Sequence, residues 1–310
     1  LEIGGQQIDK QYGEWMHMWK ELTVCPGKSV NVDKMLGNSL ALQNPGGATS
    51  AYTVYVPLQF YFCRNPGLAL PLISLQYHEV KVIIEFRQAT EVIINTNTSS
   101  PALGDTSLWV DYIYLDTDER RRFAQESHEY LIEQLQEHSQ GVSATSVNLD
   151  LDFNHPVKEL VFGVRRDTHI AAGTAQFFNF TSATDTLLTD NYDATGNIAG
   201  SFGAGTNMVT KAQLKLNGHE RFAQRNGDYF NLVQPYYHHT CGPDVGINVY
   251  SFALRPEEHQ PSGTCNFSRI DNAVLNLTLA NSNASTAIVY AVNYNVLRVQ
   301  SGMGGLAYSN

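Results

Sequence analysis

The sequence repeats itself in three blocks, which occur in the same order in each half of the chain. Residues 1–19 align with residues 214–233, and in this alignment Gly5 coincides with Gly218. The two later blocks align residues 62–84 with 252–274 and residues 108–115 with 290–297. Blocks that recur in one order are typical of a duplicated structural unit. We therefore infer that the chain holds two copies of one fold in tandem.

Short runs of β-branched and aromatic residues, bounded by Gly, Pro, Asn and Asp, dominate both copies. Many short strands with little helical periodicity indicate an all-β sandwich or barrel. Because 43% of the residues are apolar, the chain can bury a sizeable core. Strands are expected at residues 52–62, 80–86, 108–115, 130–136, 149–153, 159–164, 176–180, 213–216, 247–254, 273–279 and 287–297.

Two segments are expected to be helical. Residues 10–22 place Trp15 and Trp19 four residues apart, which puts both side chains on the same side of a helix. Residues 116–127 begin with Asp116 and have an acidic residue three positions later, as in a capping box. We therefore divide the chain into a first unit (1–116), a linker helix (117–128) and a second unit (129–310).

The first unit is expected to be incomplete at its N-terminus. The second unit has strands before its Gly218 turn, whereas the first has only residues 1–3 before the matching turn. A sandwich without its opening strands exposes a sheet edge and an apolar face. We therefore expect this polypeptide on its own to be poorly soluble.

Charge is scarce in this chain and mostly negative. Only 16% of residues are charged and the net charge is −10, against ~25% charged residues in typical soluble domains. Such a chain lacks the basic face that neutralises phosphates, so we expect no direct nucleic-acid binding. No apolar run approaches the ~20 residues of a transmembrane helix. A charge-poor surface is typical of the centre of a protein–protein contact.

No catalytic, cofactor-binding or metal-binding pattern stands out. His238 and His239 follow two tyrosines, but the HxH pattern of a cupin metalloenzyme is absent, and adjacent histidines on a strand face opposite sides. Glu257 and Glu258 are expected in a solvated loop. We expect a non-enzymatic protein without metal or cofactor, and keep a cupin-type enzyme as a remote alternative. Spacing favours reduced, mostly buried thiols over a disulfide framework or zinc site for Cys25, Cys63, Cys241 and Cys265.

Four long motifs resemble the major capsid proteins of the nucleocytoplasmic large DNA viruses, which infect algae and amoebae. They are GGQQIDKQYGEWMHMW (4–19) and the segments at 57–86, 111–136 and 247–277. The resemblance implies a tandem double jelly roll, that is, two antiparallel β-sandwiches with short helices in their loops. It also implies homotrimers of pseudo-hexagonal outline that tile an icosahedral shell above minor capsid proteins. The expected location is the virion, with assembly in the host cytoplasm.

The residues expected to matter in such a protein are structural. The expected turn residues are Gly4, Gly5, Gly13, Gly218 and Gly227, and the expected helix anchors are Trp15, Trp19, Tyr229 and Phe230. N-x-S/T triplets make glycosylation candidates of Asn97, Asn179 and Asn283. Residues 90–106 and 182–207 are expected to form loops on the outward face. The alternative function is a duplicated jelly-roll module that binds carbohydrate or attaches to a host.

Overall fold

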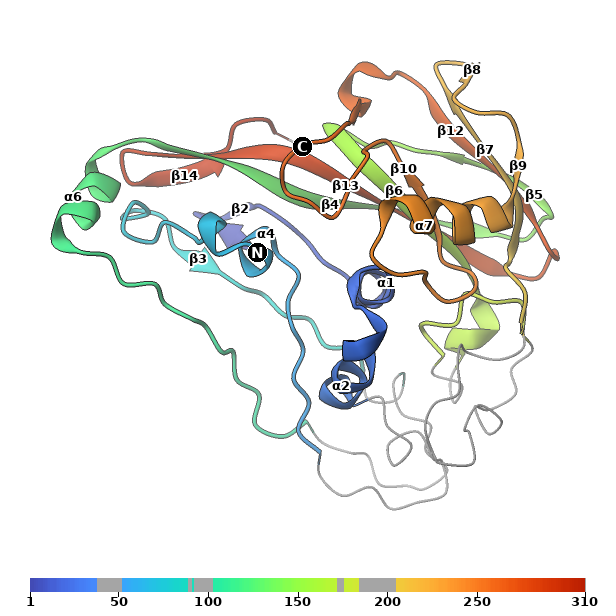
Figure 1. Cartoon of the computed structure of the whole chain (residues 1–310), viewed down its shortest axis with the longest axis horizontal. Helices are drawn as coiled ribbons and strands as arrows, with labels where there is room; N and C mark the ends of the chain where they lie inside the picture. The colour runs from blue at the N-terminus through green and yellow to red at the C-terminus, as the bar shows by residue number, and fades with distance from the viewer. Residues whose placement is uncertain (38–51, 89–90, 92–102, 172–175, 184–204, 310) are drawn as a thin grey trace.

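The computed structural model describes residues 1–37, 52–88, 91, 103–171, 176–183 and 205–309. Antiparallel strands make up most of its regular structure, and short helices cover or connect them (Figure 1). The strands are β1 (Glu2–Ile3), β2 (Gln6–Gln7), β3 (Val80–Lys81), β4 (His128–Val142), β5 (Ser146–Asp150), β6 (Pro156–Arg166), β7 (Val209–Leu216), β8 (His219–Glu220), β9 (Arg225–Asn226), β10 (Asn248–Ser251), β11 (Cys265–Asn266), β12 (Ala273–Leu279), β13 (Ser285–Gln300) and β14 (Met303–Leu306). The helical segments are α1 (Gly13–Thr23), α2 (Pro26–Leu36), α4 (Tyr61–Arg64), η1 (Pro66–Leu68), α6 (Thr117–Gln125), η2 (Asp167–Ile170), η3 (Tyr229–Val233), α7 (Gln234–His238) and η4 (Phe267–Arg269).

The second half of the chain forms a sandwich of two antiparallel sheets. One sheet has the order β10-β6-β13-β14, with β4 also paired to β13 and β11 to β6. The other has the order β5-β12-β7-β8, with β9 paired to β7. Strands that are neighbours in space are distant in sequence: β4 pairs along β13 so that His128 faces Val299 and Val142 faces Ser285. This pairing of distant strands is typical of jelly-roll topology.

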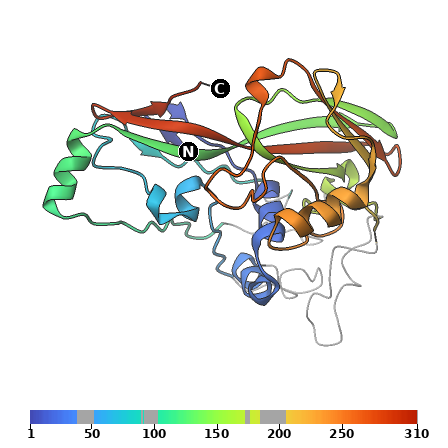
Figure 2. The same ribbon diagram turned by 45° about the horizontal axis from the view of Figure 1, so that its top comes forward.

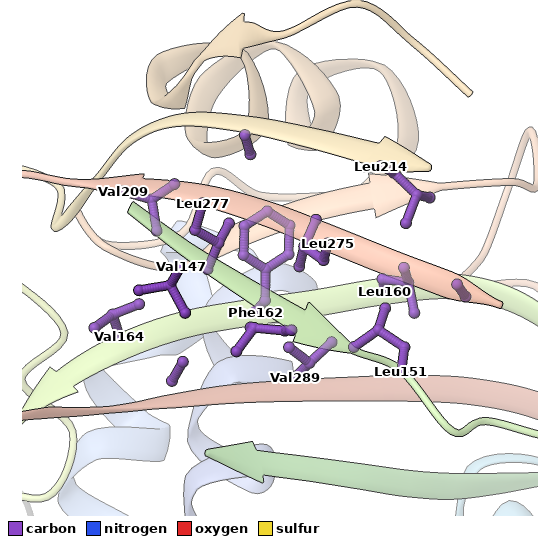
Figure 3. Close-up of a cluster of buried hydrophobic side chains, with 14 of the residues drawn as sticks. Val147, Leu151, Leu160, Phe162, Val164, Val209, Leu214, Leu275, Leu277 and Val289 are labelled. Atoms are coloured by element: carbon purple, nitrogen blue, oxygen red, sulfur yellow. The ribbon is translucent and has the colours of Figure 1, made fainter. Parts of the chain in front are cut away.

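The two sheets of the sandwich differ in how much of each is covered. Along β12 the side chains alternate between buried and half-buried, because one face packs on the core and the other meets solvent. Along β6 every side chain from Val157 to Arg165 is buried, so both faces of this central strand are covered. Between the sheets, Phe162 of β6 lies among aliphatic side chains of both layers, including Val209, Leu275 and Leu277 (Figure 3).

β4 and β13 continue beyond the sandwich into the first half of the chain (Figure 1). The Asp9 carboxylate oxygen Oδ1 accepts the Leu135 N–H of β4 at 3.0 Å. The two halves therefore share continuous strands and a common core. That core packs Ile132 of β4 and Leu297 and Val299 of β13 against Leu1, Ile3, Ile8, Phe60, Tyr61, Leu68 and Leu75.

Most of the strand predictions for the first half are wrong. Residues 61–64 form helix α4, and of residues 80–86 only Val80–Lys81 joins a sheet, next to β1. Residues 52–60, 82–86 and 108–115 lie outside any assigned strand. In the second half, residues 176–180 likewise form a turn region rather than the expected strand. A strand exists only where a neighbour completes its hydrogen-bond ladder. Residue type alone does not reveal that neighbour.

The other expected elements are confirmed in whole or in part, since only residues 149–150 of the strand expected at 149–153, and 248–251 of that expected at 247–254, lie in a strand. β12 has the expected bounds, β6 and β13 contain the expected runs, and α1 covers most of residues 10–22. α6 lies within the expected helix, and its Asp116 side chain accepts the Thr117 N–H at 2.7 Å. α1 lies beside α7 on one side of the long strands (Figure 2).

Candidate functional site at the junction of the two halves

Helix α1, from the first half of the chain, packs on the outer face of the second-half sheet. The rings of Trp15 and Trp19 pack against each other in a tilted arrangement, with centroids 5.5 Å apart, and the ring of Trp15 lies 5.6 Å from that of Tyr290 on β13. This packing explains why β6 is buried on both faces. The cluster joins Trp15, Met18, Trp19 and Leu22 of α1 to Val161, Phe180, Ile247, Val249, Ile288, Tyr290 and Val292.

A buried carboxylate on the same helix reinforces this packing. Glu14 Oε1 accepts a hydrogen bond from Arg165 Nη1 of β6 at 2.9 Å, and Arg87 Nη2 lies 2.5 Å from the same oxygen. Arg165 also donates to the backbone carbonyl of Phe177 at 2.8 Å. Arg87 and Glu14 come from the first half and Arg165 from the second, so the cluster ties the halves together.

A second buried ion cluster is centred on Glu133 of β4. Lys158 Nζ of β6, whose side chain is fully buried, lies 2.7 Å from one carboxylate oxygen, and Arg64 Nη2 of α4 lies 2.8 Å from the other. Burial alone would raise the pKa of Glu133, but His259, Lys158 and Arg64 together hold it at about 2. Burial lowers the pKa of Lys158, and Glu133 opposes that shift. The paired charges compensate for desolvation that neither residue could sustain alone.

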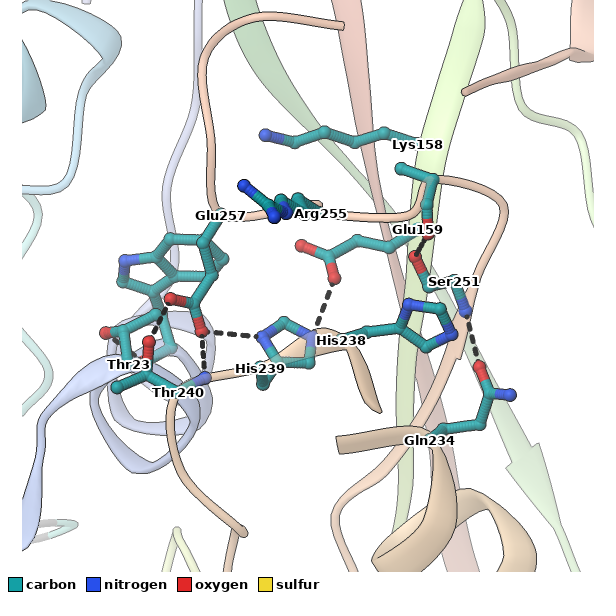
Figure 4. Close-up of polar contacts among 12 residues, drawn as sticks. Thr23, Lys158, Glu159, Gln234, His238, His239, Thr240, Ser251, Arg255 and Glu257 are labelled. Carbon is teal, nitrogen blue, oxygen red and sulfur yellow. Dashed lines mark hydrogen bonds and ion pairs between the residues drawn. The ribbon is translucent and has the colours of Figure 1, made fainter. Parts of the chain in front are cut away.

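The third cluster holds His239 between two carboxylates (Figure 4). Its Nε2 lies 3.0 Å from Glu159 Oε2 of β6, and its Nδ1 lies 3.0 Å from Glu257 Oε1. Glu257 also accepts the Thr240 backbone N–H at 2.8 Å. Burial would lower the pKa of His239, but the two carboxylates overcome it and raise the pKa to about 9. The imidazole is therefore a buried cation at neutral pH.

These contacts correct two expectations about this region. His238 ends α7 and His239 follows it, so the pair is not on a strand. Glu257 is not a solvated loop residue, since its carboxylate binds His239 and Thr240. In the described ranges, no group of three or more His, Cys, Asp or Glu side chains has the geometry to hold a metal ion.

The cysteines also differ from expectation. The thiols were expected to be mostly buried, but Cys63 is exposed and the other three are partly exposed. All four are free in this structure.

The glycines of the two repeat copies have different physical roles. Gly4, Gly5 and Gly218 adopt left-handed backbone conformations, with φ of 59°, 81° and 80°. Gly227 is instead needed for close approach, because a Cβ there would lie 1.8 Å from the Val209 carbonyl oxygen. Gly13 begins α1 with open space around it.

The aromatic residues of the second copy lie within their own sandwich. Phe230 is buried in the core between the sheets, and Tyr229 packs edge-on against it at 5.2 Å. In the first copy Trp15, which aligns with Tyr229, instead packs across the junction, together with Trp19.

The three glycosylation candidates have different surroundings. Asn179 is 4% exposed, its amide nitrogen donates to Gln176, and its amide oxygen accepts from Thr181. A glycan on Asn179 is incompatible with that burial. Asn283 is exposed, and Asn97 lies outside the described residues.

The expected outward loops lie largely outside the described residues. The base of the second is described: Thr181 bridges to Asn207, and Ser182 N–H donates to the Thr206 carbonyl at 2.9 Å. These contacts hold residues 181–182 next to residues 206–207.

The sequence patterns miss the three ion clusters entirely. Each joins residues far apart in the chain, and the His239 contacts come from three separate segments. Charged residues inside otherwise apolar strands, such as Lys158 and Glu159 in β6, are the one sequence signal that could have revealed them.

The sequence profile described as large eukaryotic DNA virus major capsid protein matches residues 119–305, and that described as major capsid protein N-terminus matches residues 1–116. The chain belongs to this family of viral major capsid proteins. It is 50% identical over 335 residues to the major capsid protein of Pyramimonas orientalis virus, spanning 100% of this chain and 75% of that protein. It is 44% identical over 415 residues to the major capsid protein of Phaeocystis pouchetii virus, spanning 100% of this chain and 80% of that protein.

Solved capsid structures show the same fold. The crystal structure of VP54 of PBCV-1, fitted into a reconstruction of the virophage Sputnik, matches with a TM-score of 0.80 and 38% identity, covering 100% of this chain and 82% of that one. A quasi-atomic model of the PBCV-1 capsid matches with a TM-score of 0.75 and 37% identity, at the same coverage. The chain is thus an all-β double jelly roll that serves as a structural capsid protein of the virion.

The comparisons favour this role over the alternative of a carbohydrate-binding or host-attachment module. Self-association within a capsid shell follows from the same role. No helix in the described ranges has the length and apolar character needed to cross a bilayer.

Proposed function

We propose that this chain forms homotrimers of pseudo-hexagonal outline, and that neighbouring trimers tile an icosahedral shell. Three chains with two similar halves each give six wedges around a closed threefold axis. The observation that supports this proposal most directly is the structure of the junction between the two halves of the chain. β4 and β13 run through both halves, and buried ion clusters link them, so each subunit offers two wedges in a fixed arrangement.

An exposed apolar surface around α7 supports contact between copies. We call it the α7 patch, and its partner in the proposal is a second copy of this chain. Tyr236 and Tyr237 are 80% and 73% exposed, which is unusual for adjacent aromatic residues unless a partner covers them. Exposed tyrosines in a charge-poor surface match the composition of interface centres. The patch comprises Leu232, Val233, Tyr236, Tyr237 and Leu254.

The finer features of the role are part of the same proposal. The protein has no enzymatic activity, assembles in the host cytoplasm and rests on minor capsid proteins beneath the shell. Residues 90–106 and 182–207 face outward, and Asn97 and Asn283 are the glycosylation candidates that remain. The units at 1–116 and 129–310, with a linker helix at 117–128, are the duplicated wedges. The two profile matches, which divide the chain near residue 117, support this division.

The oligomeric mass tests the proposal. The protein, expressed from its complete coding sequence, is purified and its mass measured by light scattering after size-exclusion chromatography. We expect three times the subunit mass. The double variant Tyr236→Ser/Tyr237→Ser should shift the protein toward monomer, whereas Tyr308→Ser, at a position that is 63% exposed outside the α7 patch, should leave the mass unchanged. A stable monomer or dimer of the unsubstituted protein would refute the trimer.

A further inference from the structure

Two cysteines from opposite halves of the chain lie next to each other at the junction. Cys25 stands between α1 and α2, as the residue before the first residue of α2. Cys241 lies in the segment after α7, and its backbone N–H donates to the Leu22 carbonyl of α1 at 2.9 Å. Figure 4 shows Thr23, the last residue of α1, beside Thr240. The two segments are thus in direct contact.

The thiol of Cys241 is directed at the residue before Cys25. Its Sγ lies 3.1 Å from the carbonyl oxygen of Val24. Because the Val24–Cys25 peptide is trans, this oxygen lies about 3 Å from the Cα of Cys25, so Cys241 Sγ lies within about 6 Å of that Cα. Cα atoms joined by a disulfide are usually about 4.4–6.8 Å apart, so a disulfide requires the sulfur of one residue to come this close to the other's backbone.

The electrostatics agree with this proximity. Burial raises the pKa of the Cys241 thiol, and a charge on Cys25 raises it further. Both side chains are partly exposed, so a small oxidant in solution can reach them. The other two thiols have basic neighbours instead: burial raises the pKa of each, and Arg64 opposes that shift at Cys63 while Arg221 opposes it at Cys265.

We propose that Cys25 and Cys241 form an intramolecular disulfide under oxidising conditions, which covalently links the first half of the chain to the second. A disulfide compound such as oxidised glutathione is the oxidant. One cysteine thiolate attacks a sulfur of the oxidant, forming a mixed disulfide and releasing one glutathione thiolate. The second thiolate then displaces the other glutathione. The two cysteines lose two protons and two electrons, and the oxidant becomes two thiols.

The bond spans the same junction as the ion clusters but differs from them in being redox-dependent. Thiols stay reduced inside a cell and oxidise outside it. The bond closes a loop that contains most of the chain, and such closure reduces the freedom of the unfolded state. The oxidised protein should therefore resist unfolding better than the reduced protein. This inference does not rest on the trimer, since both sulfurs belong to one chain.

Peptide mapping without reduction tests the proposal. The reduced protein is incubated with oxidised glutathione, alkylated, digested and analysed by mass spectrometry. We expect a linked peptide pair containing Cys25 and Cys241, and an intact mass lower by about 2 Da. Cys25→Ser and Cys241→Ser should each abolish the pair, while the control variant Cys265→Ser retains it.

Thermal unfolding provides a second measurement. Adding a dithiol reductant to the oxidised protein should lower the Tm of the unsubstituted chain and of Cys265→Ser, but leave that of Cys25→Ser unchanged. Separate glutathione adducts on Cys25 and Cys241 without a linked peptide would overturn the proposal. Disulfides between chains through exposed Cys63, with no bond to Cys241, would overturn it equally.

Discussion

Three buried carboxylates each hold a basic side chain from another element. Glu14 binds Arg165, Glu133 binds Lys158, and Glu159 binds His239. Buried pairs of this kind add little net stability compared with apolar packing, but the loss of one partner leaves an uncompensated charge. At the residue scale, the junction is therefore sensitive to single substitutions.

The cation on His239 makes stability depend on pH. The pKa is raised from its ordinary 6.5 to about 9 in the folded chain, so the folded state binds the proton more tightly than the unfolded state. The stabilisation is fully present below pH 6.5 and is lost as pH rises through about 9, by up to about 3 kcal/mol. Tm measured from pH 6 to pH 10 should fall across this window. His239→Gln should flatten the fall, whereas the exposed His219→Gln should not.

Removal of the Glu133 charge should strongly destabilise the protein. Glu133→Gln leaves Lys158 buried without its counter-ion, which costs about 3–5 kcal/mol. Urea unfolding measures the change. Glu129→Gln on the same strand breaks an exposed pair with Arg298 and should cost less than about 1 kcal/mol. Equal losses of unfolding free energy for the two substitutions would show that the buried cluster stabilises the protein no more than an exposed ion pair does.

At the scale of elements, the sequence predicts a helix or strand correctly where the contacts that stabilise it are local. β12 alternates between core and solvent, so its own residues specify it, and its expected bounds are correct. The apolar side chains on one side of α1 likewise predict a helix, but they do not reveal that the helix covers β6 and β13. Residues 52–60 have strong strand composition but remain unpaired, because strand formation depends on a neighbouring strand. The ion clusters depend on contacts between distant segments, which composition cannot reveal.

Packing of α1 should stabilise the second half as well as the first. Trp15→Ala removes a buried side chain that contacts Tyr290, and should cost about 3–5 kcal/mol. Hydrogen exchange should become faster in β6 and β13 as well as in α1. Val30→Ala on α2, at a position that is 56% exposed, is the control and should cost about 0.5 kcal/mol or less. Exchange that changes only in α1 would mean that the helix does not support the sheet.

At the scale of the whole molecule, apolar surface is concentrated in the unpaired segments of the first half. Tyr55, Trp109 and Tyr114 are 61%, 87% and 92% exposed. Exposed apolar surface of this extent is typical of interaction sites and of aggregation-prone proteins. Together with the α7 patch, it indicates that the molecule is built to be covered by other polypeptide.

The 310-residue polypeptide, expressed alone, should therefore self-associate without order. We expect it to scatter light, bind a hydrophobic dye and elute in the void volume during size-exclusion chromatography. Clean elution as a monomer with a cooperative melt would contradict this expectation.

Electron microscopy of the protein expressed from its complete coding sequence tests the capsid role most directly. Class averages viewed down the symmetry axis should show three subunits as six similar lobes with flat sides. Particles with three lobes, or with two dissimilar halves separated by a variable gap, would contradict an account in which one rigid subunit supplies two equivalent wedges to the shell.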